Sequence, residues 1–113
     1  MPDIKTTTYQ FTRKPRSVWW PVTIRRPRDD GVDEIPIRMQ FLLPKRSVLR
    51  AKGFSNEDAA GYVLDWDGIT DADSGQPLPF SAENLAALRE DAYFENAVAV
   101  GLARAANGAA EKN

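Results

Sequence analysis

Four aspartates have a spacing that could place several carboxylates around one metal ion: Asp65, Asp67, Asp71 and Asp73. A calcium loop of the EF-hand type needs a glycine after three alternating oxygen ligands and a bidentate glutamate at its end. Here Gly68 and Gly75 stand at other positions, and residues 77–79 read Pro-Leu-Pro where the glutamate is needed. The pattern argues against calcium, and we expect these aspartates to hydrogen-bond their own loop backbone.

The same carboxylates could serve as a general acid and base, but no partner nucleophile is recognisable around them. The chain contains no cysteine and no histidine, which removes thiolate nucleophiles, imidazole catalysis, disulfides and zinc fingers. Neither a Gly-rich phosphate loop nor a serine in a nucleophile elbow is evident. We therefore predict a protein that is not an enzyme and that uses no cofactor and no metal.

Basic residues interleaved with two tryptophans suggest a surface that could stack bases and neutralise phosphates: Arg13, Lys14, Arg16, Trp19, Trp20, Arg25, Arg26 and Arg28. The whole chain is slightly acidic, however, with a net charge of −1 and an isoelectric point near 5.4. A repulsive field from its acidic part opposes phosphate approach, and arginines beside a hairpin also keep sheet edges soluble. A nucleic-acid-binding protein is the alternative; we expect no nucleic acid partner.

Charge is strongly segregated along the 113 residues. Residues 1–53 hold twelve of the fifteen Lys and Arg and five of the sixteen acids, a net charge of +7, whereas residues 54–113 carry a net charge of −8. Such a split indicates complementarity within the chain, attraction between copies, or a nucleic-acid-binding part. The length suits a single domain over 1–113. No run approaches the roughly 18 apolar residues of a membrane span, so we expect no membrane partner and a cytosolic location.

The basic half has the patterns of strands. Residues 6–11 are rich in β-branched and aromatic side chains and favour a short strand. Residues 17–26 and 35–43 alternate apolar and polar side chains around a turn at Asp30-Gly31, which predicts an antiparallel hairpin with one wet face. Pro21 suits an edge strand. The fold class is therefore α+β, with an N-terminal hairpin of two or three strands.

About three helices are expected in the acidic half. Ser55 is a good N-cap for a helix over 56–66, and residues 67–79 have the composition of an ordered loop. Ser81 can cap a second helix that runs to about Glu90, with Phe80 and Leu85 as a hydrophobic staple. Large apolar groups bracketing the polar loop predict a structural motif that joins the first two helices: Trp66, Gly68, Ile69, Leu78, Pro79, Phe80, Ser81 and Leu85.

The last helix is expected over 92–106, and little of its circumference is polar. A helix that is apolar on most sides needs burial on most sides, which one small core provides with difficulty. We therefore predict self-association, with opposite charges of the two halves steering copies together; the alternative is that its alanine-rich face lies in water. The predicted partner-binding residues are Trp20, Phe94, Val98 and Leu102.

Three blocks of the sequence, 19–22, 63–71 and 76–85, resemble the tail assembly chaperones of long-tailed bacteriophages. The likeness covers most of the chain and is strongest from Trp66 through Leu85. It implies a protein of the bacterial host cytoplasm that is absent from the mature virion and keeps the phage tape measure protein soluble. It also implies that a frameshift-extended form recruits tail tube protein, and Glu111-Lys112-Asn113 is compatible with a slippery codon run. A minor structural virion protein is a further alternative.

Overall fold

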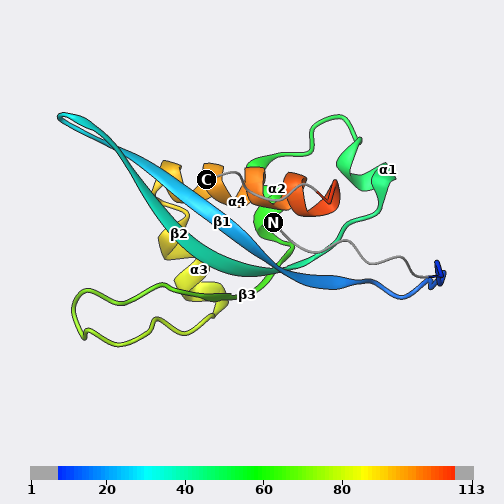
Figure 1. Ribbon diagram of the computed structural model, residues 1–113, viewed down its shortest axis with the longest axis horizontal. Coiled ribbons are helices and arrows are strands. Elements are labelled where there is room, and N and C mark those ends of the chain that lie inside the picture. The colour runs from blue at the N-terminus through cyan, green and yellow to red at the C-terminus, as the bar shows by residue number, and fades with distance from the viewer. Residues whose placement is uncertain (1–7, 109–113) are drawn as a thin grey trace.

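The computed structural model describes residues 8–108, which form the α+β fold that the sequence predicts. A three-stranded antiparallel sheet in the order β1-β2-β3 is combined with four helices within this part of the chain (Figure 1). In chain order the elements are β1 (Ser17–Arg28), β2 (Gly31–Leu42), α1 (Arg46–Leu49), α2 (Asn56–Ala60), β3 (Val63–Asp67), α3 (Ala82–Leu88) and α4 (Ala92–Ala106).

The hairpin of β1 and β2 is longer toward its turn than the predicted strands. The two strands pair antiparallel along their whole length, and their tip projects beyond the helices (Figure 1). The tip contains no buried side chain, so backbone pairing and charge hold it together. Ion pairs join its exposed residues: Arg25–Glu34 at 3.8 Å, Arg28–Asp30 at 3.1 Å and Arg28–Asp33 at 3.2 Å.

The two faces of the hairpin differ in the way that the alternating sequence predicts. Val22 lies opposite Ile37, and Trp20 lies opposite Met39, all on the inner face. The strands turn their exposed residues outward, among them Pro21 and Arg38. Because β1 is an edge strand, Pro21 sits where its missing N–H costs least. Alternation with one covered face therefore sets the register of this hairpin.

The third strand is not where the sequence suggests it. Residues 8–16 form no strand, and residues 6 and 7 of the predicted strand 6–11 lie outside the described part. The third strand is β3, whereas a helix was expected over 56–66; α2 ends at Ala60, with Gly61 as its C-cap. The apolar spacing of residues 63–67 suits a helix and a strand alike. The strand forms because this stretch pairs with β2, where Trp66 lies opposite Met39.

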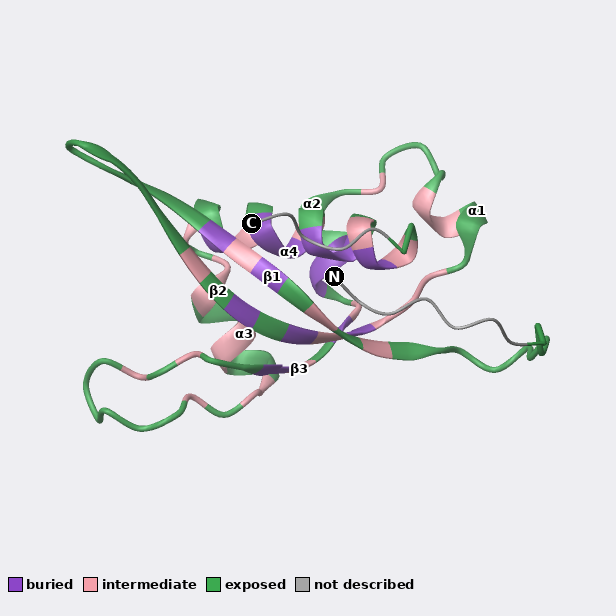
Figure 2. Cartoon of the chain, in the orientation of Figure 1, coloured by how far each residue is buried: buried purple, intermediate pink, exposed green. Residues whose placement is uncertain are grey.

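Helix α4 covers the inner face of the sheet and has the bounds that the sequence predicts. Figure 2 shows its buried stripe facing the buried part of the hairpin. Gly101 permits this close approach, because a Cβ atom there would lie 2.8 Å from Cγ2 of Val22. The largest fully buried side chains come from both layers: Phe41, Met39, Leu102, Val22 and Val98. One cluster of buried side chains thus joins the sheet to the last helix.

Candidate functional site

Three of the four predicted partner-binding residues belong to the core. Phe94, Val98 and Leu102 are only 2, 0 and 1% exposed, so all three pack in the core of the single chain. For Phe94 and Val98 the assignment as a partner surface was wrong, because the sheet covers the stripe of α4 that carries them. Leu102 belongs to the same core and also borders the groove described below. Trp20 is partly buried against the same core, and a partner contact there stays a prediction.

The opposite face of α4 is the part that a single copy leaves open. Tyr93 and Val100 are 46 and 37% exposed, and Ala103 is exposed beside them along the helix. Small side chains make up much of the remaining surface, and alanine exposes little apolar area. The folded chain therefore hides more of its last helix than the sequence suggests, and the exposed apolar remainder is this narrow stripe.

The predicted structural motif does come together around one tryptophan. Trp66 is 6% exposed, and its indole Nε1 donates a hydrogen bond to the carbonyl oxygen of Leu78 at 2.7 Å. The Phe80 ring meets the Trp66 ring edge to face, with centroids 4.9 Å apart. Ile69 and Leu85 pack against the same core. Its role is structural: the indole ties a polar loop to the sheet.

The ends of this loop are set by local backbone chemistry. Gly68 has φ of 93°, a conformation that glycine adopts without strain, and it lies against Ile37 of β2. Ser81 caps α3 as predicted, its Oγ accepting the backbone N–H of Asn84 at 3.0 Å. The Asn84 side-chain amide donates to the Pro79 carbonyl oxygen at 2.9 Å.

Two of the four aspartates accept hydrogen bonds from nearby backbone N–H groups, as expected for this stretch. Oδ1 of Asp71 accepts the N–H of Asp73 at 2.9 Å, and Oδ1 of Asp65 accepts the N–H of Trp66 at 2.8 Å. Within residues 8–108 no group of three or more acidic side chains is gathered as metal ligands would be. Asp65 and Asp71 therefore stabilise the local backbone.

A groove between helices is the feature that sequence reasoning missed. It has a volume of about 660 Å³ and separates α1 and its flanks from α2 and the second half of α4. Apolar side chains form most of its lining: Leu43, Pro44, Leu49, Phe54, Ala59, Ala99, Leu102, Ala103 and Ala106. Of the helices that border the groove, α1 was not anticipated; the available signal was the pair of arginines four residues apart around Val48 and Leu49.

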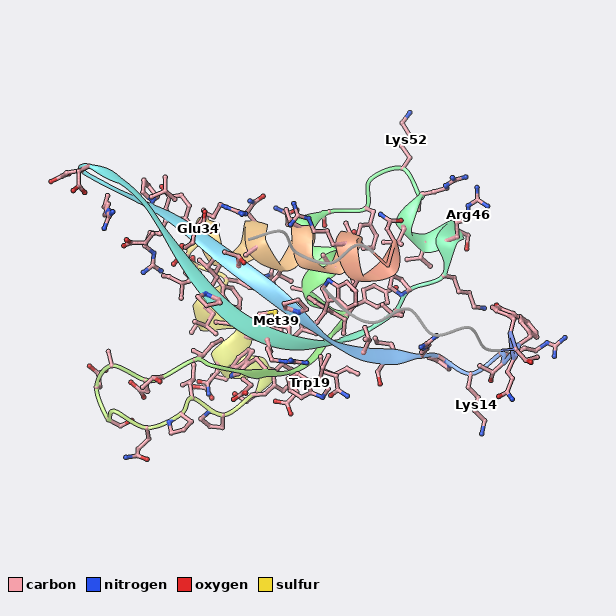
Figure 3. All side chains as sticks on the ribbon, viewed as in Figure 1. Lys14, Trp19, Glu34, Met39, Arg46 and Lys52 are labelled. Atoms are coloured by element: carbon pink, nitrogen blue, oxygen red, sulfur yellow. The ribbon has the colours of Figure 1, made fainter. Side chains whose placement is uncertain are left out.

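One rim of the groove is cationic and the other is neutral. Arg46 and Arg50 line it from the α1 side, and Ser55, Asn56 and Asn107 line it from the other helices. Exposed Lys45 and Lys52 flank the arginines, and none of these four cations forms an ion pair with another described residue. Arg46 and Lys52 both extend outward at this end of the molecule (Figure 3).

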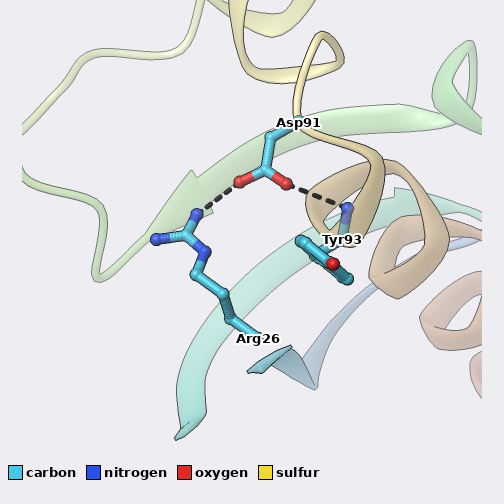
Figure 4. Close-up of polar contacts among 3 residues, drawn as sticks. All are labelled: Arg26, Asp91 and Tyr93. Carbon is cyan, nitrogen blue, oxygen red and sulfur yellow. Dashed lines mark hydrogen bonds and ion pairs between the residues drawn. The ribbon is translucent and has the colours of Figure 1, made fainter. Parts of the chain in front are cut away.

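An ion pair fixes the start of α4 to the hairpin. Arg26 of β1 pairs with Asp91, whose other carboxylate oxygen accepts the N–H of Tyr93 at 2.9 Å (Figure 4). Burial raises the pKa of Asp91, but the hydrogen bond from Arg26, the backbone N–H groups and the Arg26 charge together lower it below the ordinary value of 3.8. Asp91 is therefore both the N-cap of α4 and its link to the sheet.

Comparison of the chain with protein-family models, with curated proteins and with solved structures finds no match. Among residues 8–108, no helix has both the length and the apolar character needed to cross a membrane. The groove, its charges and the sequence blocks around Trp66 are the features of this chain that bear on its function.

Proposed function

We propose that this chain is a non-enzymatic phage tail assembly chaperone that self-associates and binds the tape measure protein while the virion tail is built. The observation that carries the proposal is the open groove between α1, α2 and α4, whose lining is mostly apolar and lies beside charged side chains. A tape measure protein exposes long apolar helices before the tail tube encloses it. Repeated weak contacts by many copies could cover such helices through multivalency.

The sequence blocks that resemble tail assembly chaperones support the same proposal. Residues 63–71 and 76–85 are separated by residues 72–75, and they meet at the hydrogen bond between Trp66 and Leu78. Such a motif preserves a fold rather than a reaction centre. In this role the chain acts in the cytoplasm of the bacterial host, is left out of the mature virion, and recruits tail tube protein through a frameshift-extended form.

Co-expression tests the proposal. The proposal expects a very long helical reading frame immediately downstream of the gene. Its product should precipitate when expressed alone, and should stay in the supernatant and co-purify with this chain when both are expressed. A product that is equally soluble without the chain would contradict the chaperone role. Detection of the chain in purified virions would instead identify a structural component.

Exposed aromatic residues beside cations favour nucleic acid as the second candidate partner. Tyr9 and Phe11 are 86 and 68% exposed, and the Arg13 guanidinium lies 5.1 Å from the centroid of the Phe11 ring. Such a segment could stack unpaired bases. A single-stranded oligonucleotide should then be retained at moderate salt and lost steeply as salt rises. The chaperone proposal expects no retention.

A further inference from the structure

We infer that the groove binds an amphipathic helix whose polar flank is acidic, and that Arg46 and Arg50 receive its carboxylates. The inference rests on the proposed function for the helical nature of the partner. It adds the place of contact on this chain and the charge of the segment that is recognised.

The lining of the groove favours an apolar occupant, because most of its side chains are apolar. Ala103 and Ala106 present small side chains from α4, so a helix can approach the backbone of α4 closely. Leu49 and Phe54 stand across the groove and offer larger contact surfaces. An occupant with leucine-sized residues along one stripe would therefore fit between small side chains on one wall and large ones on the other.

The charges require that the occupant be acidic along one side. An occupant that covers the rim takes Arg46 and Arg50 partly out of water, which is unfavourable unless anionic groups replace the water. No described residue supplies such a group to them. On α2, Glu57 and Asp58 are exposed, but Asp58 is bonded to Ser55 within the capping box. Carboxylates from the occupant would complete the site, and guanidinium groups bind them in a bidentate manner.

Two segments within residues 8–108 were candidates for a second copy, and neither meets both requirements. Tyr9 and Phe11 are apolar, but Arg13, Lys14 and Arg16 follow them, so this segment of a second copy would be repelled by the arginines of the rim. Helix α3 has one acidic residue in its first turn, Glu83, but its leucines already pack against the core. Neither segment fits the groove, and the occupant that we infer is a different protein.

Helix α1 is built to adjust to an occupant. It has four residues, none of them buried, and no side chain caps its N-terminus. A short segment held by so few contacts can shift at low cost. The opposite wall of the groove, formed by α2 and α4, is held more firmly, because its residues Leu102 and Ala59 belong to the core. The arginines can thus move to meet carboxylates while the apolar wall stays in place.

Three synthetic peptides of about 18 residues test the inference against the full chain. They share one leucine and alanine stripe and carry Glu, Gln or Lys along the same flank, and binding is followed by fluorescence anisotropy at low salt. The Glu peptide should bind about tenfold more tightly than the Gln peptide, and the Lys peptide most weakly. The double variant Arg46→Gln with Arg50→Gln should lose the preference while keeping its affinity for the Gln peptide within about twofold.

Two matched controls locate the effect. Arg13→Gln with Lys14→Gln removes the same charge outside the groove and should keep the preference for the Glu peptide. Ala103→Glu should weaken all three peptides, whereas Asn96→Glu, two turns earlier on α4 and outside the lining, should not. Equal binding of the three peptides, or loss of the preference in the Arg13 and Lys14 variant, would overturn the inference. A change of oligomeric state in the Arg46 and Arg50 variant would assign the groove to a second copy and overturn it too.

The outcome can be separated from that of the proposed function. If the groove variants hold the tape measure product in solution as well as the wild type does, the chaperone role stands and the groove assignment fails. If the peptides bind as expected but the tape measure product is no more soluble with the chain than without it, the acidic helix belongs to another partner and the chaperone role fails.

Discussion

Two connections of similar length, residues 68–81 and residues 43–55, behave differently although both are polar and exposed along much of their course. The first is tied down by the indole bond from Trp66 to Leu78 and by the cap of α3. The second has backbone turns, the short α1 and the Ser55 cap of α2, with Phe54 partly buried against the core and in a tilted ring contact with Tyr62 at 6.3 Å. One buried side-chain donor ties the middle of the first connection to the sheet, and no described side chain does the same for α1 in the second.

The largest difference should follow from removing the anchor of the first connection. Trp66→Ala should lower the free energy of unfolding by about 3–5 kcal/mol, because a buried ring and its hydrogen bond are lost together. Leu49→Ala, the matched change in the second connection, should cost about 1 kcal/mol or less. Urea unfolding followed by far-UV circular dichroism measures both. If Trp66→Ala fails to fold, Trp66→Phe should still fold and lose about 1–2 kcal/mol with the missing bond; equal losses at Trp66 and Leu49 would remove the contrast.

Helix α4 has one tightly packed position, Gly101, and one open position, Ala103, only two residues apart. Gly101→Ala should destabilise by about 1–3 kcal/mol, since its Cβ would lie 2.8 Å from Val22 and the gain in helix propensity is only about 1 kcal/mol. Ala103→Leu, two residues later in the groove lining, adds more atoms but should change stability by about 0.5 kcal/mol or less. Thermal unfolding of the two variants compares a packed wall with an open one. A greater loss for Ala103→Leu would show that the groove is closed in solution.

The link between the hairpin and α4 should show a dependence on pH. The lowered pKa of Asp91 means that its contribution is complete above 3.8 and is lost as pH falls through the lower value of the folded state. Asp91→Asn keeps a capping acceptor but loses the charge, so it should cost about 1 kcal/mol or less near neutral pH. The difference between the variant and the wild type should shrink as pH falls below 3.8. A difference that does not shrink in acid would contradict this assignment.

The smallest effect is expected at the other inward-facing tryptophan. The Nε1 atom of Trp20 is buried without an acceptor among residues 8–108, a condition that costs about 1–3 kcal/mol. Trp20→Phe removes this donor while losing some apolar area, so stability should stay within about 1 kcal/mol of the wild type. Trp66→Phe, with its bonded donor, is the matched comparison in the same unfolding measurement. A loss at Trp20 as large as that at Trp66 would show that Trp20 has an acceptor in solution.

Much of the fold could be predicted because its signals are local. The alternation of 17–26 and 35–43 predicts a hairpin with one wet face, and Ser55 and Ser81 mark the helix starts that the structure confirms. The motif around Trp66 was also predictable, since large apolar residues bracket a polar loop. The groove was not, because its walls come from residues 43–59 and 99–107, and no pattern within either stretch shows that they face each other.

By itself the sequence determined the inventory: no cysteine or histidine for catalysis, a basic first half, an acidic second half, and an α+β pattern. Only the tertiary structure decided that Val63–Asp67 is a strand, that Phe94, Val98 and Leu102 face the sheet, and that Arg46 and Arg50 border an apolar groove. Periodicity tells which side chains of an element need burial, but not which surface buries them. That choice depends on contacts between residues distant in the chain, such as the approach of Gly101 to Val22.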